Sequence, residues 1–151
     1  MKAESNIKPN KIEIENISKE RCDIVITSNI AEIVEDEKVK YSYDIYRINV
    51  CYNEDIKNNL EKNYDKYLDI AINRENKKNA IEEIPRLQEQ LDNTDYKIIK
   101  CSECQLVGLE MPYNIKELHL TRQKLRDRIN ELQEIIWKRG KNYGNSNNCC
   151  D

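Results

Sequence analysis

Two cysteines separated by two residues, Cys101 and Cys104, form the stretch of this sequence that most closely matches a chemical motif. A C-x-x-C pair can supply half of a zinc site or a redox-active dithiol, because both need two sulfur atoms close together. Zinc would need further ligands from His119 or from the adjacent Cys149 and Cys150, whose spacing is not that of a chelating pair. A redox site would need a βαβ context, which the sequence lacks. The simpler interpretation is a helix with two half-buried thiols. A small metal- or redox-dependent regulator that uses Cys101 and Cys104 remains the hypothesis from another functional class.

Other residues that could take part in catalysis also have simple interpretations. His119 is the only histidine, and no nucleophile elbow or Gly-rich oxyanion loop accompanies it, so we interpret it as a polar residue beside a helical seam. Carboxylate pairs such as Glu13 with Glu15 and Glu32 with Glu35 are expected by chance in a chain with 35% charged residues. Neither a dinucleotide fingerprint nor a P-loop occurs. The sequence therefore predicts a protein that is not an enzyme, with no catalytic residue, metal, cofactor or small-molecule substrate.

The composition predicts a thin hydrophobic core. The 151 residues include 38% hydrophobic and 35% charged residues, no Phe, one Trp and nine Tyr. Most buried apolar area must then come from Ile, Leu and Tyr. We expect elongated helices or burial against other chains.

The charge pattern argues against nucleic acid and membranes as partners. The net charge is -3, and 25 basic and 28 acidic residues are mixed along the chain, so no basic stripe forms. No window approaches the roughly 20 apolar residues of a membrane helix. The first residues, MKAESNIKPNK, lack the apolar region of a signal peptide. We expect a cytoplasmic protein whose six cysteines are free thiols.

The N-terminal part predicts a flexible or extended arm followed by an antiparallel β-meander. Residues 1–10 are polar and contain Pro9, which indicates the arm. Period-2 alternation in KIEIENI and RCDIVITS and the β-forming run VKYSYDIYRINVCY indicate three or four strands. In the last run, the apolar residues occupy odd-numbered positions from Val39 to Ile45 and even-numbered positions from Tyr46 to Tyr52. This change means that both faces are covered or that one extra residue is inserted. We expect the insertion, as a β-bulge or a strong bend near Ile45 and Tyr46.

A long amphipathic helix is predicted after the strands. Asn53 is a suitable N-cap, and the apolar spacing that follows indicates 20 to 25 helical residues. The polar run at 73–79 either continues or loosens this helix, and Pro85 predicts a kink or a fresh start. We place a boundary here, with a β-meander and amphipathic helix at 11–79 and a helical region at 80–137.

The C-terminal region predicts a helical hairpin and then a mobile tail at 138–151. The first helix begins near Thr94 and follows Tyr96, Ile99, Glu103 and Leu106 until Gly108 ends it. Asn114 and Glu117 form the capping-box-like start of the second. Its seam has heptad spacing, with Arg122 as an interruption, so packing within the chain and a coiled coil both remain open. The fold class is α+β.

Two sets of residues are candidates for contact with a partner. A tyrosine cluster in the strands suits an interface, and equally suits a strand core that lacks Phe. It comprises Tyr41, Tyr43, Tyr46 and Tyr52. The apolar seam of the last helix comprises Leu118, Leu125, Ile129, Leu132 and Ile136.

Several short stretches carry a resemblance to a known kind of protein. They are Thr94-Asp95-Tyr96, Lys100-Cys101-Ser102-Glu103, Pro112-Tyr113, Arg122-Gln123, Leu125-Arg126-Asp127 and Ile129-Asn130, with the earlier block KYSYDIYRINVCYNEDIKNNLEKNYDKYLDIA. With these, residues 22 to 136 resemble the small accessory proteins encoded beside tail-fibre and baseplate genes in phages and phage-tail-like bacteriocins of Gram-positive bacteria. The matching residues are packing and capping residues.

The resemblance implies a non-enzymatic tail accessory protein. Such a protein assists folding and trimerisation of a tail fibre, or remains as a permanent component of the baseplate or tail. Its expected partners are tail-fibre or baseplate proteins and other copies of itself. It would occupy the bacterial host cytoplasm during assembly, and the virion tail or phage-tail-like particle if it remains.

Overall fold

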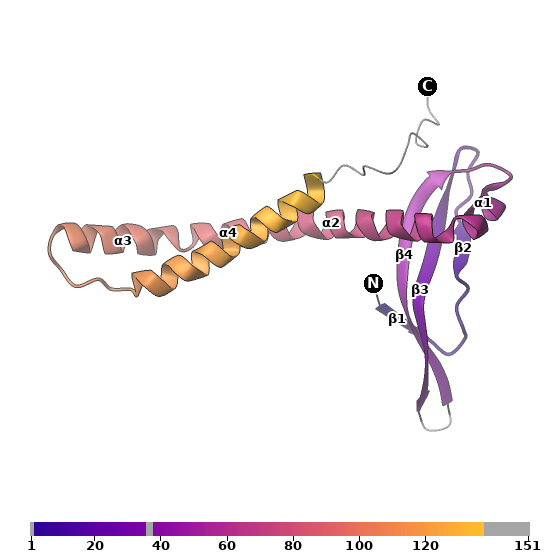
Figure 1. The fold of residues 1–151 in the computed structure, drawn as a ribbon, viewed down its shortest axis with the longest axis horizontal. Coiled ribbons are helices and arrows are strands. Elements are labelled where there is room, and N and C mark those ends of the chain that lie inside the picture. The colour runs from indigo at the N-terminus through magenta and orange to yellow at the C-terminus, as the bar shows by residue number, and fades with distance from the viewer. Residues whose placement is uncertain (1, 36–37, 138–151) are drawn as a thin grey trace. The chain divides into compact units, whose positions relative to one another are not determined.

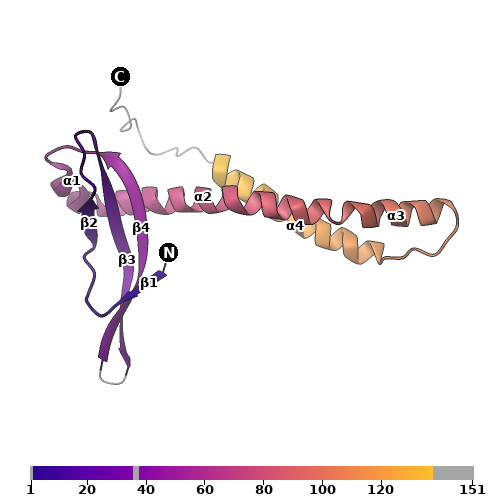
Figure 2. The same cartoon turned by 180° about the vertical axis from the view of Figure 1, so that it is seen from behind.

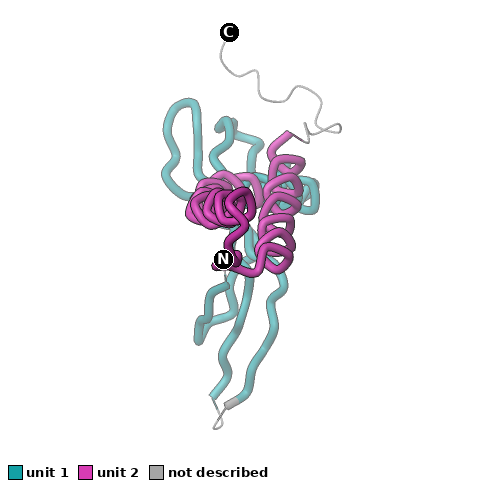
Figure 3. The backbone as a smooth tube through the Cα atoms, turned by 90° about the vertical axis from the view of Figure 1, so that its left-hand side faces the viewer, with its two compact units in different colours: residues 1–75, 143–151 teal, residues 76–142 magenta. Residues whose placement is uncertain are grey.

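The computed structural model describes residues 2–35 and 38–137, and it has an α+β fold (Figure 1). A four-stranded antiparallel sheet is followed by four helices within these residues. The chain divides between Glu75 and Asn76 into two compact units, shown in teal and magenta in Figure 3. This division lies inside a helix, whereas the sequence placed the boundary between residues 79 and 80. The tail predicted at 138–151 lies outside the described residues.

The sheet is built on a long hairpin of two strands, β3 (Arg21–Glu35) and β4 (Lys38–Cys51). The short strand β2 (Ile12–Glu15) pairs with β3, and β1 (Lys2–Ser5) pairs with β4, so the strand order is β1-β4-β3-β2. Figure 2 shows β1 and β2 at opposite sides of the hairpin. Strands β2, β3 and β4 form the predicted meander. Of the two alternatives predicted for residues 1–10, a flexible arm is wrong for Lys2–Ser5 and an extended one is correct. This segment is an edge strand whose register places Ala3 opposite Tyr43.

The β-bulge lies in β3 rather than in β4. The pairs Ser28↔Asp44 and Ala31↔Ser42 leave Asn29 and Ile30 opposite Tyr43, while β4 continues without a register shift. Asn29 takes a left-handed conformation with φ 51°, and its side-chain amide donates to Asp44 Oδ2 over 2.8 Å. The bulge predicted near Ile45 and Tyr46 is therefore wrong in position.

The change of parity in β4 arises because both faces of the hairpin are covered. One face carries Cys22, Ile24 and Ile26, which are fully buried under the helices of unit 1. On the other face Val25 and Thr27 are each 4% exposed. Residues 6–11, the N-terminal strap, connect β1 to β2 across this second face, and the Thr27 N–H donates to the Lys11 carbonyl over 2.9 Å.

Helix α1 (Ile56–Lys62) and the first part of α2 (Tyr64–Asp92) complete the core of unit 1. Ile56, Leu60 and Ala71 are buried at the predicted helical spacing. Two predictions for this segment are wrong. Asp55, not Asn53, holds the N-cap position. The single helix is also interrupted at Asn63, whose side-chain amide donates to the Asn59 carbonyl over 3.0 Å. Helix α2 then runs through 73–79 and past Pro85 without a fresh start.

Unit 2 contains the rest of α2 with α3 (Asp95–Leu106) and α4 (Ile115–Trp137). Its most buried side chains are Ala80, Cys101, Cys104, Ile129 and Leu132. Helix α4 runs antiparallel to the preceding helices, because Arg122 contacts residues 91–95 and Arg128, further along α4, contacts Glu83. Helices α3 and α4 thus form the predicted hairpin.

Capping interactions define the turn between α3 and α4 largely as predicted. Gly108 has φ 71°, and the Leu109 and Gly108 N–H groups donate to the Cys104 and Gln105 carbonyls, which is a Schellman ending. At the start of α4, the Glu117 N–H donates to Asn114 Oδ1 over 3.2 Å.

Candidate functional site

The C-x-x-C pair lies inside unit 2 as two free thiols. Cys101 is fully buried and Cys104 is 9% exposed. The Cys101 Sγ donates to the Tyr113 carbonyl over 3.6 Å, so this thiol contacts the turn that leads into α4. Within the described residues, no group of three or more His, Cys, Asp and Glu side chains is arranged to hold a metal ion. The packing of these thiols agrees with the simpler interpretation of the motif.

Among the described residues, His119 and two clefts near the sheet are open to solvent. His119 is exposed on α4 beside the half-buried Leu118. An open cleft of about 240 Å³ is lined by Ile12, Ile14, Lys57 and Glu61. A second, of about 270 Å³, lies between the N-terminal strap and the sheet. Both volumes are below the roughly 300–1,000 Å³ typical of small-molecule sites.

The four tyrosines proposed as an interface are divided between the two faces of the sheet. Tyr46 and Tyr52 pack against the core of unit 1. Burial raises the pKa of the Tyr46 phenol above its usual range, and the negative charges of Asp44 and Glu75 add to this rise. Tyr41 and Tyr43 have the opposite parity and are half-buried on the strap face, paired with Ser5 and Ala3 of β1.

Tyr41 and Tyr43 belong to a row of apolar side chains that continues toward the end of the hairpin. We call residues 30–35 of β3 and 38–43 of β4 the distal ribbon. Val34 pairs with Val39, and these side chains are 66% and 41% exposed. Because Val39, Tyr41 and Tyr43 alternate along a strand without a bulge, they lie on one face. Within the described residues, the distal ribbon therefore presents the exposed Val34 and Val39 next to the half-buried Tyr41 and Tyr43.

The outer edge of β3 in the distal ribbon is also open. Strand β2 pairs only with Asp23 to Ile26, and the last backbone bond on this side is donated by Thr27. Among the described residues, no strand lies beside β3 beyond this point. An uncovered strand edge offers N–H and C=O groups to a strand of another protein.

The seam residues of α4 are used inside unit 2. Ile129 and Leu132 are 7% and 3% exposed, and Leu118, Leu125 and Ile136 are half-buried on the same face. Packing within the chain therefore accounts for the seam, and a coiled coil is not shown. Little of Ile129 and Leu132 remains for contact with another protein.

Arg122, which interrupts the seam, joins three segments of unit 2. Its side chain is only 12% exposed, and Nη1 donates to the Leu91 carbonyl over 2.8 Å and to the Thr94 hydroxyl. Nη2 lies 2.6 Å from Asp95 Oδ1. Since Leu91 lies in the last turn of α2 and Asp95 begins α3, Arg122 attaches the junction between these helices to α4.

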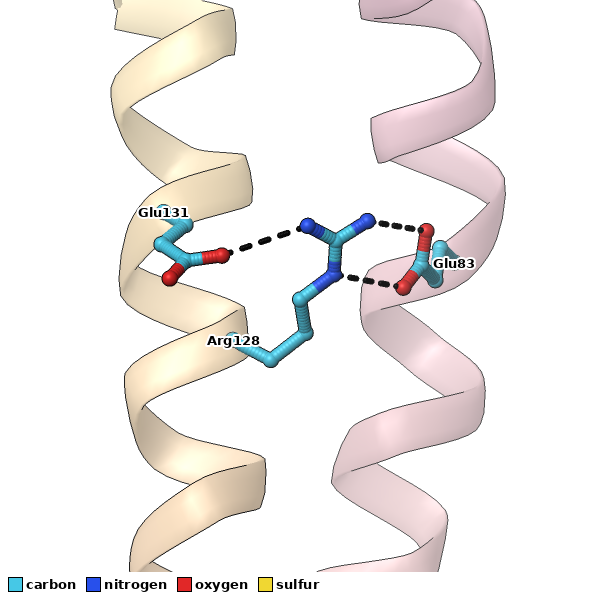
Figure 4. A network of polar contacts seen from close by, with 3 residues as sticks. All are labelled: Glu83, Arg128 and Glu131. Atoms are coloured by element: carbon cyan, nitrogen blue, oxygen red, sulfur yellow. Dashed lines mark hydrogen bonds and ion pairs between the residues drawn. The ribbon is translucent and has the colours of Figure 1, made fainter.

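A second arginine makes a more exposed connection between the same helices. Arg128 donates to both carboxylate oxygens of Glu83, over 2.9 and 3.2 Å, and to Glu131 over 3.2 Å (Figure 4). The hydrogen bond from Arg128 lowers the pKa of the Glu83 carboxyl below its usual range. The paired geometry fixes the alignment of α4 along α2.

The residues whose spacing predicted helix α3 lie mostly on its exposed side. Tyr96, Ile99 and Leu106, which gave the helical spacing, are 64%, 58% and 87% exposed. The buried face carries Cys101 and Cys104 instead. The interpretation of the C-x-x-C pair as two half-buried thiols of a helix therefore identified the packed side of α3, and Cys101 contacts the turn there.

Among residues 2–35 and 38–137, no helix combines the length and the apolar character needed to cross a membrane. Comparisons with protein-family models, curated protein sequences and solved structures found no match to this chain.

Proposed function

We propose that this chain is a non-enzymatic accessory protein of a phage tail or a phage-tail-like particle. In this proposal it binds a tail-fibre or baseplate protein during assembly in the bacterial host cytoplasm. It acts as an assembly chaperone or stays on the fibre; the alternative is a permanent structural protein of the baseplate or tail. The motivation is the resemblance of residues 22 to 136 to such proteins.

The distal ribbon is the observation that best supports a binding role. It combines an open backbone edge on β3 with exposed apolar side chains, of which Val34 is 66% exposed. A partner strand added to this edge would gain backbone hydrogen bonds, and side chains such as Tyr41 and Val39 would give selectivity. Exposed apolar side chains that lie next to one another, as Val34 and its cross-strand partner Val39 do, are a feature of protein-binding surfaces.

Co-expression with the tail proteins encoded by neighbouring genes tests this proposal. The partner should co-purify with the wild-type chain, and Val34→Lys should abolish the capture because it puts a charge on the contact surface. Ile17→Lys is the matched control, since Ile17 is a 58% exposed apolar residue of the same unit outside the distal ribbon. Its capture of the partner should equal that of the wild type.

Two results would count against the proposal. One is failure of the wild-type chain to capture any of these tail proteins. The other is equal capture by Val34→Lys and the wild type, which would place the contact elsewhere. Mass spectrometry of purified particles then separates the two forms of the proposal, because a resident component is present in the particle and an assembly chaperone is not.

A further inference from the structure

We infer that two copies of this chain associate through the exposed face of α3, with the two α3 helices antiparallel. This inference concerns unit 2 and does not rest on the proposed function. The contact surface is the outer stripe of α3, which we define as Tyr96, Ile99, Glu103 and Leu106.

The outer stripe has the spacing of a helix–helix seam. Its members follow one another at intervals of three, four and three residues, which places them on one side of an α-helix. Tyr96, Ile99 and Leu106 are 64%, 58% and 87% exposed, so the described part of the chain leaves them uncovered. The opposite side of α3 is already occupied by the packing of Cys101 and Cys104.

The charges of the stripe favour an antiparallel second copy. In a parallel pair Glu103 would face Glu103 of the other copy, and two carboxylates would lie together in the seam. In an antiparallel pair centred near Cys101, Tyr96 faces Leu106 and Ile99 faces Glu103. Lys100, which follows Ile99, then lies beside the carboxylate of Glu103 on the other copy.

Lys100 and Glu103 of one copy are placed so that they can form ion pairs with Glu103 and Lys100 of the other copy. Within one helix, Lys100 Nζ lies 3.4 Å from Glu103 Oε2, and the two side chains are 44% and 60% exposed. In the dimer, the two lysines and two glutamates of these pairs would alternate around the two-fold axis, so that each carboxylate has a positively charged neighbour. A purely apolar partner helix would instead bury Glu103 without a new positive neighbour, so the charge pattern favours a copy of the same helix.

The expected association is reversible and depends on protein concentration. Helix α3 has 12 residues and is therefore about 18 Å long. Val107 and Leu109, 69% and 65% exposed at its end, add apolar surface next to Leu106. A contact of this length is at the small end of specific interfaces, which bind transiently.

Sedimentation equilibrium of the full chain tests the inference. The wild type should show a monomer–dimer equilibrium, and Ile99→Lys should raise the dissociation constant at least tenfold because it puts a charge into the seam. Ile81→Lys is a closely matched control, because Ile81 on α2 is also 58% exposed but lies outside the stripe. It should leave the dissociation constant unchanged. A monomeric wild type at every accessible concentration, or equal effects of the two substitutions, would overturn the inference.

Reversal of the charges tests the antiparallel orientation. Lys100→Glu and Glu103→Lys should each weaken the dimer, because each creates like charges between the copies. The double variant should restore it, since the charges are again opposite. Circular dichroism of each variant monitors folding. Failure of the double variant, when folded, to associate better than either single variant would contradict the arrangement.

Isotope-mixed cross-linking provides an independent measurement. Unlabelled and ¹⁵N-labelled chains are mixed and treated with a carbodiimide, which joins an amine to a neighbouring carboxylate. The antiparallel dimer should give Lys100–Glu103 links that contain one labelled and one unlabelled peptide. Links found only between peptides of the same label would show that the pair stays within one chain and would overturn the inference.

Discussion

The guanidinium of Arg122 and the carboxylate of Asp95 lie 2.6 Å apart, and they connect the middle of α4 to the first residue of α3. The same arginine donates to the Leu91 carbonyl at the end of α2. A residue that interrupts an apolar heptad in the sequence is therefore the residue that holds the α2–α3 junction. Its polar character follows from the backbone carbonyl and hydroxyl that it must satisfy.

Replacement of Arg122 should destabilise unit 2. Arg122→Ala removes charge-assisted hydrogen bonds from a side chain that is 12% exposed, and we expect a loss of about 2 kcal/mol in the free energy of unfolding. Asp95→Asn should cost less than about 1 kcal/mol, because the Asp95 side chain is 56% exposed. Urea denaturation measures both. Arg126→Ala, at an exposed position of α4, is the control; an equal loss there would show that the contacts of Arg122 are unimportant.

The ion pair between Arg128 and Glu83 should make stability depend on pH. Since the pKa of Glu83 is lowered in the folded state, its contribution is present above the unfolded-state pKa and is lost as the pH falls through the folded-state pKa. Glu83→Gln should therefore be less stable than the wild type at neutral pH, and the difference should shrink on acidification. Denaturation at several pH values measures it. The control is Glu134→Gln on the exposed face of α4; a constant deficit for Glu83→Gln would argue against the linkage.

Two leucines of α4 should differ in their effect on stability. Leu132 is 3% exposed, and Leu132→Ala should cost about 2–5 kcal/mol because it leaves a cavity in unit 2. Leu120 is 62% exposed, and Leu120→Ala should change the free energy of unfolding by no more than about 0.5 kcal/mol. Thermal and urea denaturation compare them. Similar losses at both positions would mean that the assigned buried face of α4 is wrong.

Substitution of Asn29 should reveal the cost of the bulge in β3. Asn29→Ala places a residue with a Cβ and no polar side chain at φ 51°, and we expect a loss of about 1–2 kcal/mol. Asn29→Gly tolerates this conformation and should retain more of the wild-type stability, although it also loses the bond to Asp44. The difference between the free energies of unfolding of these two variants, measured by denaturation, gives the cost of the left-handed backbone conformation. A glycine variant less stable than the alanine variant would contradict this account.

The sequence predicted the elements whose local patterns agree with their packing. Alternation identified β2, β3 and β4, and helical spacing identified the residues that α1 and α2 bury. Gly108 and Asn114 marked the ends of α3 and α4 because their caps are local interactions. These features depend on neighbours along the chain, which a single sequence displays.

The features that were missed depend on distant residues. Strand β1 has the sequence KAES, which has no apolar alternation, and it is a strand only because β4 provides its hydrogen-bond partners. The parity change in β4 was explained by a bulge in the wrong strand, because the cover over the second face comes from the N-terminal strap. The α3 residues that gave the helical spacing, Tyr96, Ile99 and Leu106, lie on its exposed side. The packed side carries the smaller Cys101, which contacts the distant Tyr113.

The placement of β1 and β2 affects the tendency of the chain to aggregate. One continuous segment, residues 2–15, supplies the strands on both outer edges of the β3–β4 hairpin. Detachment of this segment would uncover the outer edges of β3 and β4 together with the face of the sheet that carries Val25. Edges of this kind promote intermolecular pairing, so the N-terminal segment protects the hairpin against aggregation from both sides at once.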